Sequence, residues 1–334
     1  MIINVKTSKG QYPIYLERGF LKKAGTVLPQ TGRALIVTDS GVPKEYAETV
    51  ASQLPNAAIH TVPKGESSKC IRIYAELLEA LCKDSFTRSD CVIAVGGGVV
   101  GDLAGFVAAT YLRGIAFYNI PTTVLSQVDS SIGGKVAVDF CGYKNNVGAF
   151  YPPNAVIIDS DVLNTLPSRQ ISNGLAEAVK MSLTGDSELF GLFENGNITE
   201  NIDKIIEKSL LYKKSVVEQD ERESGLRRVL NFGHTIGHAI ESREGFDGLY
   251  HGECVALGML PMCSKEVRQR LINVLKRLNL PYEIPYKAEE LIESMKHDKK
   301  MSGREITVVK VEKIGEFVLK TEPFTEFAKE VEML

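Results

Sequence analysis

The segment LRRVLNFGHTIGHAIE carries polar side chains at helical spacing. They fall at positions i, i+4, i+7 and i+11, one face of an α-helix: Arg227, Asn231, His234 and His238. The other positions are mostly apolar, so the pattern predicts a buried helix whose polar face needs partners inside the protein. A solvated face is the plainer interpretation, but such faces favour Lys and Glu. Two His, one Asn and one Arg favour a functional site.

Histidines four residues apart on a helix can bind one metal ion together. Thr235 follows His234, so the motif is not H-E-x-x-H and supplies no metalloprotease base. His251 follows in HGE, and spacing alone leaves open which of the three histidines bind a metal. Glu177 and Lys180, at i and i+3 in GLAEAVK, could complete the set. A surface ion pair is their alternative, but the small apolar residues around them favour a buried, functional pair.

A second candidate is the glycine-rich run CVIAVGGGVVGDLAGF. Gly96, Gly98 and Gly101 satisfy G-x-G-x-x-G between a predicted strand and a predicted helix, where backbone N–H groups bind pyrophosphate. A tight turn without a ligand is the alternative. No acidic residue follows at about 20 positions, where a ribose carboxylate is expected. Asp102 instead lies at the helix start, and the segment 65–69, GESSK, is a second candidate for nucleotide contact; a helix cap with a solvated charge pair is its alternative.

Two kinds of structure must position these residues. Before residue 159, apolar runs alternate with amphipathic segments, which predicts a parallel sheet covered on both faces. The predicted strands are 33–39, 57–64, 90–97, 114–121 and 154–159, and the helices between them are 42–54, 68–84 and 99–112. Beyond it, helical periodicity dominates in 175–185, 202–220, 226–241 and 254–278, before a hairpin around Ile314 and Gly315. We expect an α/β domain over 1–159 and a helical domain over 160–334.

Composition limits the classes of partner. The 334 residues carry a net charge of −3, so nucleic acid is not expected, and an anionic ligand needs locally placed Lys and Arg. No signal peptide or membrane span is expected, since the N-terminus has no basic-then-apolar pattern and Asp102 and Arg113 interrupt the longest apolar stretch. The six cysteines form no C-x-x-C pair, which favours a reducing cytoplasm.

Several segments together resemble the 3-dehydroquinate synthase family of sugar phosphate cyclases. They run in order along the chain from about Glu66 to Lys300, and include AVGGGVVGDLAGFVAATYLRGI, PTTVLSQVDSSIGGKVAVDF, YKNNVGAFYPP, NGLAEAVK, LRRVLNFGHTIGHAIE, HGECVALGM and HDKK. The resemblance implies an N-terminal nucleotide-binding domain and a mainly helical, metal-binding C-terminal domain, as in glycerol dehydrogenases and iron-type alcohol dehydrogenases.

The resemblance also implies roles for individual residues. It assigns a divalent metal, usually zinc with cobalt as the alternative, to Glu177, His234 and His251, so that His238 faces the substrate. It assigns NAD to Asp39, Glu66, Lys69, Gly97, Gly98, Asp102, Thr122, Thr123 and Lys144, with Asp129 and Lys135 also near the cofactor. It assigns the substrate to Arg113, Asp129, Lys135, Asn145, Lys180, Lys213, Arg227, Asn231, His238 and either Lys299 or Lys300.

The implied activity is a phosphate-eliminating lyase step of the shikimate pathway. Its substrate is 3-deoxy-D-arabino-heptulosonate 7-phosphate, its products are 3-dehydroquinate and phosphate, and NAD is reduced and reoxidised within one turnover. The family also implies a homodimer in which the partner contributes Arg113. The chain departs from the family pattern at Gly134-Lys135-Val136, where GKT is typical, and at Asn146, where Met is frequent.

Three alternatives stay open at this point. The chain could be a cyclase for another sugar phosphate. It could be a net dehydrogenase for glycerol or glycerol phosphate, which would accumulate NADH. A non-enzymatic NAD sensor or metal store is the third, and the polar stripe argues against it because a sensor needs no anion pocket beside a metal.

Overall fold

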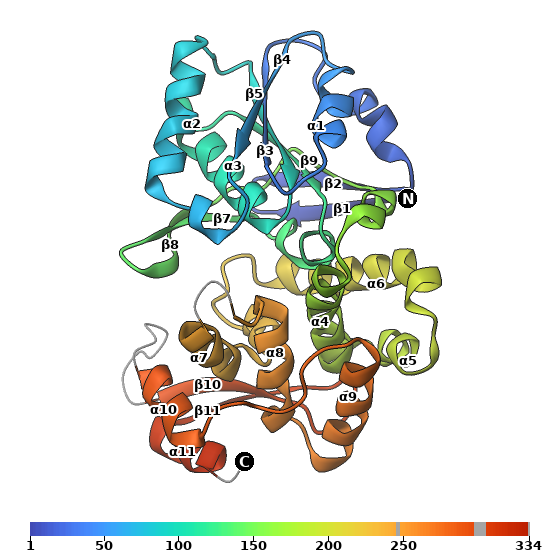
Figure 1. The fold of residues 1–334 in the computed structure, drawn as a ribbon, viewed down its shortest axis with the longest axis vertical. Helices are drawn as coiled ribbons and strands as arrows, with labels where there is room; N and C mark the ends of the chain where they lie inside the picture. Colours follow the sequence, from blue (N-terminus) through green and yellow to red (C-terminus); the bar gives the residue numbers. More distant parts are fainter. Residues whose placement is uncertain (245–247, 297–304, 333–334) are drawn as a thin grey trace. The chain divides into compact units, whose positions relative to one another are not determined.

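The computed structural model describes residues 1–244, 248–296 and 305–332. The chain forms two compact units, Met1–Pro167 and Ser168–Leu334, and each has its own set of elements (Figure 1). The sequence placed the division at residue 159, where the last strand of the first unit ends. In the structure a short 3₁₀ segment, η5 (Ser160–Thr165), also belongs to the first unit.

The first unit is built on a seven-stranded sheet with the order β1-β2-β9-β6-β5-β3-β4. Its strands are β1 (Ile2–Thr7), β2 (Gly10–Leu16), β3 (Ala34–Asp39), β4 (Ala57–Val62), β5 (Cys91–Gly96), β6 (Ala116–Pro121) and β9 (Ala155–Ile158). All neighbours are parallel except β1 and β2. The five predicted strands are confirmed. The edge pair β1–β2 was not predicted.

Helices cover both faces of this sheet. They are α1 (Lys44–Ala51), α2 (Ile71–Lys83) and α3 (Gly98–Thr110), with the 3₁₀ segments η1 (Phe20–Thr26), η2 (Glu66–Ser68) and η3 (Tyr111–Arg113) and the π-helical turn η4 (Ser126–Ser130). Strand β5 is buried at every residue: Val92 and Ala94 share a core with α2 and α3, while Ile93 and Val95 share one with α1 and η1. A strand buried on both faces reads as a continuous apolar run.

A separate antiparallel hairpin, β7 (Lys135–Phe140) and β8 (Tyr143–Phe150), was not predicted. It is joined to the segment before α2, because the Asp139 N–H donates to the Lys69 carbonyl over 2.7 Å. Most of β8 is exposed. The apolar-polar alternation that marks a half-buried strand is therefore weak there, and the sequence offered little signal.

The second unit is mainly helical. Its helices are α4 (Ser168–Gly185), α5 (Ser187–Asn195), α6 (Ile198–Gln219), α7 (His234–Glu244), α8 (His251–Met259), α9 (Lys265–Arg277), α10 (Ala288–Lys296) and α11 (Phe324–Glu332), with 3₁₀ segments η6 (Leu226–Asn231) and η7 (Leu260–Met262). Helix α4 is buried from Asn173 to Thr184 and packs against α6 and α8. The predicted hairpin is confirmed as β10 (Glu305–Lys310) and β11 (Val318–Pro323).

The helical region predicted over 254–278 is divided in two. Helix α8 passes into η7 at Pro261, and a new helix, α9, begins where the Ser264 hydroxyl accepts the Val267 N–H. Proline lacks the N–H that a continuing helix needs, and serine caps the next helix. Within the described ranges, no helix combines the length and apolar character required to cross a membrane.

Candidate active site and metal centre

Three helices of the second unit bring one carboxylate and two imidazoles together. Glu177 lies in the middle of α4, while His234 and His251 are the first residues of α7 and α8. Glu177 Oε1 lies 3.6 Å from His234 Nε2 and 3.4 Å from His251 Nε2. Ligand atoms around a tetrahedral zinc ion, at roughly 2.0–2.1 Å from it, are separated by about 3.4 Å. Both distances therefore fit ligands of one such ion, and the ligand atoms of the three side chains all lie within 4.8 Å of one another.

The predicted continuous helix over 226–241 is wrong. The chain leaves η6 at Phe232, and Gly233 follows with φ 77°, a left-handed conformation that favours glycine. Close packing also requires glycine here: a Cβ at Gly233 would lie 2.7 Å from the carbonyl oxygen of Val255. The break divides the predicted polar face, so that Arg227 and Asn231 lie in η6 while His234 and His238 begin α7.

The carboxylate of Glu177 is fully buried and paired with a cation. Lys180 Nζ lies 2.5 Å from Glu177 Oε2 and also donates to the Leu230 carbonyl over 2.7 Å. The i, i+3 pair predicted from the sequence is therefore present and buried, with side-chain exposures of 2% and 0%. Because Lys180 occupies Oε2, the other oxygen, Oε1, is the one that faces both imidazoles.

The charges of these groups suit a divalent cation. Burial opposes ionisation of Glu177, but Lys180 and His251 outweigh it and hold the pKa of the carboxyl at about 2. Burial, reinforced by Lys180, lowers the pKa of His234 well below its usual value. Burial likewise opposes protonation of His251, yet hydrogen bonds to Glu177 and Glu241 raise its pKa to about 10. An ion bound here would replace the Nε2 proton of His251 and find a carboxylate and a neutral imidazole already in place.

Each histidine is oriented through its second ring nitrogen. His234 Nδ1 lies 3.0 Å from the Phe232 carbonyl oxygen, and His251 Nδ1 lies 3.3 Å from Glu241 Oε2. His238, which the spacing placed beside His234, has its ring centroid 5.3 Å from the His234 ring and 6.0 Å from the His251 ring. The described residues therefore offer two overlapping donor groups, one with Glu177 and one with His238 and Glu241.

The loop before η6 contacts two further predicted site residues, Arg227 and Asn231. Asp220 accepts the N–H groups of Ser224, Gly225 and Arg227 over 2.7–2.9 Å. Burial opposes its ionisation, but these bonds dominate and lower the pKa of its carboxyl to about 2. The loop closes around the guanidinium of Arg227, which is 2% exposed and donates to the Glu221 carbonyl.

Glu223 contacts a predicted site residue, Asn231, and the sequence did not reveal this contact. Asn231 Nδ2 donates to Glu223 Oε1 over 2.6 Å, and Glu223 has φ 61°. In the run DERES, Glu223 has the appearance of an ordinary solvated charge, and only its contact with Asn231 distinguishes it.

The predicted lysines differ in how far the structure describes them. Lys213, on α6, is 5% exposed. Lys299 and Lys300 lie outside the described residues.

In the first unit, the glycine run forms the turn between β5 and α3. Gly97 precedes the helix and Gly98 begins it. A side chain at Gly97 would lie 3.1 Å from Thr123 Cγ2, and one at Gly98 would lie 3.2 Å from the Ser130 hydroxyl. The turn thus leaves the N-terminal N–H groups of α3 bare of side chains, as a phosphate site requires.

Three residues predicted to contact the cofactor meet beside this turn. Lys69, only 5% exposed, lies 2.5 Å from Asp102 Oδ2 and 3.9 Å from Glu66 Oε1. Burial alone would lower the pKa of Lys69, but the neighbouring carboxylates together have the larger effect, so its pKa is raised. Lys69 also donates to Asn145 of β8. The segment GESSK is therefore bonded to α3 instead of being a solvated pair.

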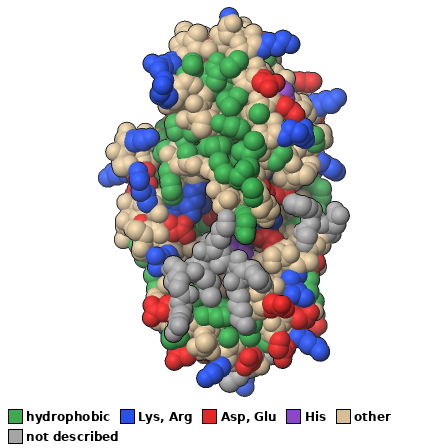
Figure 2. Space-filling model, turned by 90° about the vertical axis from the view of Figure 1, so that its left-hand side faces the viewer, with side chains coloured by type: hydrophobic (Ala, Val, Ile, Leu, Met, Phe, Trp, Pro, Cys, Tyr) green, Lys and Arg blue, Asp and Glu red, His purple; other side chains and the backbone are tan. Residues whose placement is uncertain are grey.

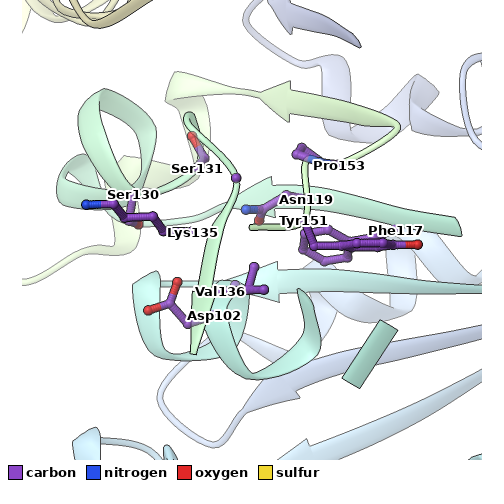
Figure 3. Close-up of a pocket in the computed structure, with 11 residues that line it drawn as sticks. Asp102, Phe117, Asn119, Ser130, Ser131, Lys135, Val136, Tyr151 and Pro153 are labelled. Carbon is purple, nitrogen blue, oxygen red and sulfur yellow. The ribbon is translucent and has the colours of Figure 1, made fainter. Parts of the chain in front are cut away.

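Other predicted residues of this unit are spread around α3. Figure 3 shows a small cavity lined by Asp102 of α3 and Asn119 of β6. Ser130 at the end of η4, Ser131 after it and Lys135 at the start of β7 also line it. Asp129 lies in η4, and Lys144 in β8 is exposed. Thr122 and Thr123 follow β6, and the Thr122 N–H donates to the Gly96 carbonyl over 2.9 Å. Asp39 ends β3 and accepts the Gly41 N–H. Arg113 is exposed on η3 with φ 68°.

The fold is that of the sugar phosphate cyclases. The whole chain superposes on all of a 2-deoxy-scyllo-inosose synthase crystallised with carbaglucose-6-phosphate, NAD⁺ and Co²⁺, with a TM-score of 0.90 and 24% identity. It also matches 2-epi-5-epi-valiolone synthase from Streptomyces hygroscopicus subsp. jinggangensis, crystallised with NAD⁺ and Zn²⁺. There the TM-score is 0.87 and the identity 26%, over 96% of this chain and 95% of that one. A probable glycerol dehydrogenase from Sinorhizobium meliloti is more distant. Its TM-score is 0.59 and its sequence identity 18%, over 86% of this chain and 89% of that one. The predicted fold class is confirmed.

Sequence comparison narrows the class further. Family models for the 3-dehydroquinate synthase N-terminal and C-terminal domains match residues 59–173 and 174–301. The 3-dehydroquinate synthase of Desulforamulus reducens is 43% identical over 89% of this chain and 90% of its own length. That of Enterococcus faecalis is 41% identical over 98% of this chain and 97% of its own length. The chain belongs to the 3-dehydroquinate synthase family, as the sequence predicted.

Proposed function

We propose that the chain converts 3-deoxy-D-arabino-heptulosonate 7-phosphate to 3-dehydroquinate and phosphate, with NAD and a divalent ion, zinc or cobalt, as cofactors. Membership of the family supports this activity, since relatives at 39–43% identity over at least 89% of the chain are 3-dehydroquinate synthases. The observation that carries it is the cluster of Glu177, His234 and His251, whose charge and spacing fit a zinc ion. Such a centre is what a metal-assisted oxidation of a hydroxyl requires.

The two units take different parts in this proposal. The α/β domain, predicted as 1–159, binds NAD through the bare turn at Gly97 and Gly98 and through Asp102. The helical domain, predicted as 160–334, holds the metal. When bound, NAD would accept and return a hydride, and the ion would polarise the hydroxyl that is oxidised.

The chain's own residues prepare the second unit for an anionic substrate. Lys180 balances the charge of Glu177, so the carboxylate stays ionised where a cation is to bind. Lys213 and Arg227 are almost fully buried cations, and burial strengthens their attraction for a carboxylate or phosphate. Asn231 is held by Glu223 and can orient a hydroxyl. We assign the remaining substrate contacts to Asp129, Lys135, Asn145 and Arg113, as the family resemblance implies.

A homodimer is part of the proposal. Figure 2 shows hydrophobic side chains gathered on one face of the first unit. The exposed large hydrophobic side chains of this unit include Ile71, Leu112, Phe140, Tyr143 and Phe150. Arg113 follows the exposed Leu112, so a partner that covers Leu112 would also contact Arg113.

The six cysteines are free, which supports the predicted reducing cytoplasm.

The test follows phosphate, dehydroquinate and NADH together. Wild-type protein with zinc and NAD should release phosphate and form dehydroquinate in equal amounts, while NADH stays at a catalytic level. His251→Ala should abolish both products and lower the bound zinc, and His60→Ala, a histidine on the edge strand β4, serves as the control. Steady NADH accumulation with glycerol would instead identify a net dehydrogenase. Turnover of glucose 6-phosphate in place of the heptulosonate phosphate would identify another cyclase.

A further inference from the structure

A second carboxylate lies on the far side of His251 from Glu177. His251 Nε2 is 3.4 Å from Glu177 Oε1, and His251 Nδ1 is 3.3 Å from Glu241 Oε2. The two nitrogens of one imidazole therefore face two different carboxylates. Glu241 belongs to α7, two turns beyond His234, so one helix supplies both a candidate ligand and the partner of another. Glu241 is the last residue of the segment HAIE, and the family resemblance implies no role for it.

The carboxylate of Glu241 is mostly buried, so it requires a hydrogen-bond donor such as His251. The Glu241 side chain is only 11% exposed, and a buried carboxylate is costly unless it accepts hydrogen bonds. The Nδ1–H of His251 supplies such a bond. His251 itself is 32% exposed, more than His234 at 12%, so its ring is less restrained by packing. A directional hydrogen bond therefore matters more for His251 than for His234.

The same atoms could be read as a second metal site made by His238, Glu241 and His251. The chemistry of imidazole argues against that interpretation. A neutral imidazole has one lone pair, so if Nε2 binds an ion, Nδ1 carries the proton and donates. His251 Nδ1 then cannot be a ligand, and the second group loses one of its three donors. His234 follows the same rule, with the Phe232 carbonyl as its acceptor.

We propose that Glu241 is a positioning residue of the metal centre: it accepts the Nδ1–H of His251, and so selects the tautomer and ring orientation that direct Nε2 toward Glu177 and the ion. A charged acceptor also makes the imidazole a stronger ligand than a carbonyl would. The inference rests on the metal centre of the proposed function, and its test uses metal binding without substrate or NAD.

The experiment measures zinc affinity by competition with a chromogenic chelator. Loss of such a partner lowers metal affinity about 10- to 100-fold. We expect that range for Glu241→Ala and a smaller loss for Glu241→Gln, whose amide oxygen can still accept the Nδ1–H. Glu188→Gln, a glutamate with an 84% exposed side chain on α5, should bind zinc as the wild type does. His251→Ala, which removes the ligand itself, sets the maximum loss.

A spectroscopic readout separates positioning from a general loss of structure. With Co²⁺ in place of zinc, the visible absorption bands report the ligand geometry, and they should shift in Glu241→Ala and return toward wild type in Glu241→Gln. Unchanged affinity in Glu241→Ala, while His251→Ala loses the metal, would overturn this inference and leave the metal centre intact. Two zinc ions per wild-type chain, with one lost in His238→Ala, would also overturn it. A wild type that binds no zinc would refute both proposals.

Discussion

Replacement of one glycine, Gly258→Ala, tests whether the contact between α7 and α8 sets the geometry of the metal centre. A Cβ at Gly258 would lie 2.0 Å from the carbonyl oxygen of Gly233 and 2.6 Å from the nitrogen of Gly237. Both are backbone atoms, so no side-chain rotation can relieve the clash. Ordinary contact begins at 3.4 Å, so the backbones must separate by about 1.4 Å, the difference between 3.4 and 2.0 Å.

That displacement affects stability and metal binding in different ways. Overpacking destabilises a protein by about 1–3 kcal/mol, and we expect the upper end here because backbone atoms must move. The higher helix propensity of alanine offsets about 1 kcal/mol of this loss. The net loss is about 2 kcal/mol, or roughly 4–8 °C in Tm. Ligand distances at metal sites lie within about 0.2 Å of their standard values. A separation of about 1.4 Å between the helices that carry His234 and His251 should therefore reduce zinc affinity by at least about tenfold.

Gly191→Ala is the matched control. Gly191 is also a helical glycine, within α5, and a Cβ there would meet no atom within 4 Å. The same substitution should stabilise the protein by about 0.5–1 kcal/mol and leave zinc binding unchanged. The Tm should therefore fall in Gly258→Ala and rise in Gly191→Ala, and zinc affinity should fall only in Gly258→Ala. A Gly258→Ala protein with wild-type Tm and zinc affinity would show that the close backbone approach does not exist.

Two further predictions concern single charged groups. The pKa of the Asp220 carboxyl is lowered from 3.8 to about 2 in the folded protein. Its ionised form therefore adds up to about 2 kcal/mol to the free energy of unfolding above about pH 4, and this contribution is lost as the pH falls to about 2. Urea unfolding between about pH 5 and 2 should show this loss in the wild type and a flatter profile in Asp220→Asn; parallel profiles would contradict the assignment. Lys69→Met should destabilise the first unit by about 2–3 kcal/mol, somewhat less than a fully buried broken pair, because the side chains of Asp102 and Glu66 are 20% and 27% exposed. Exposed Lys64→Met is the comparison, and equal urea midpoints for the two variants would argue against a structural role of Lys69.

The sequence by itself determined the features that depend on neighbouring residues. Continuous apolar runs predict strands buried on both faces, and β3, β5 and β9 follow because their hydrophobic pattern is local. The glycine run predicts a bare turn before α3 for the same reason. Glu177 and Lys180 form their pair because i, i+3 spacing on one helix brings them together whatever surrounds them.

Only the tertiary structure decided which separate segments meet. The stripe from Arg227 to His238 has helical spacing, yet the close approach of α8 at Gly233 breaks the helix there. The contacts of Glu223 with Asn231 and of Glu241 with His251 depend on how the chain returns on itself. Periodicity reports which face of an element is buried but not its partner. The roles of these two glutamates therefore became visible only when the helices were packed.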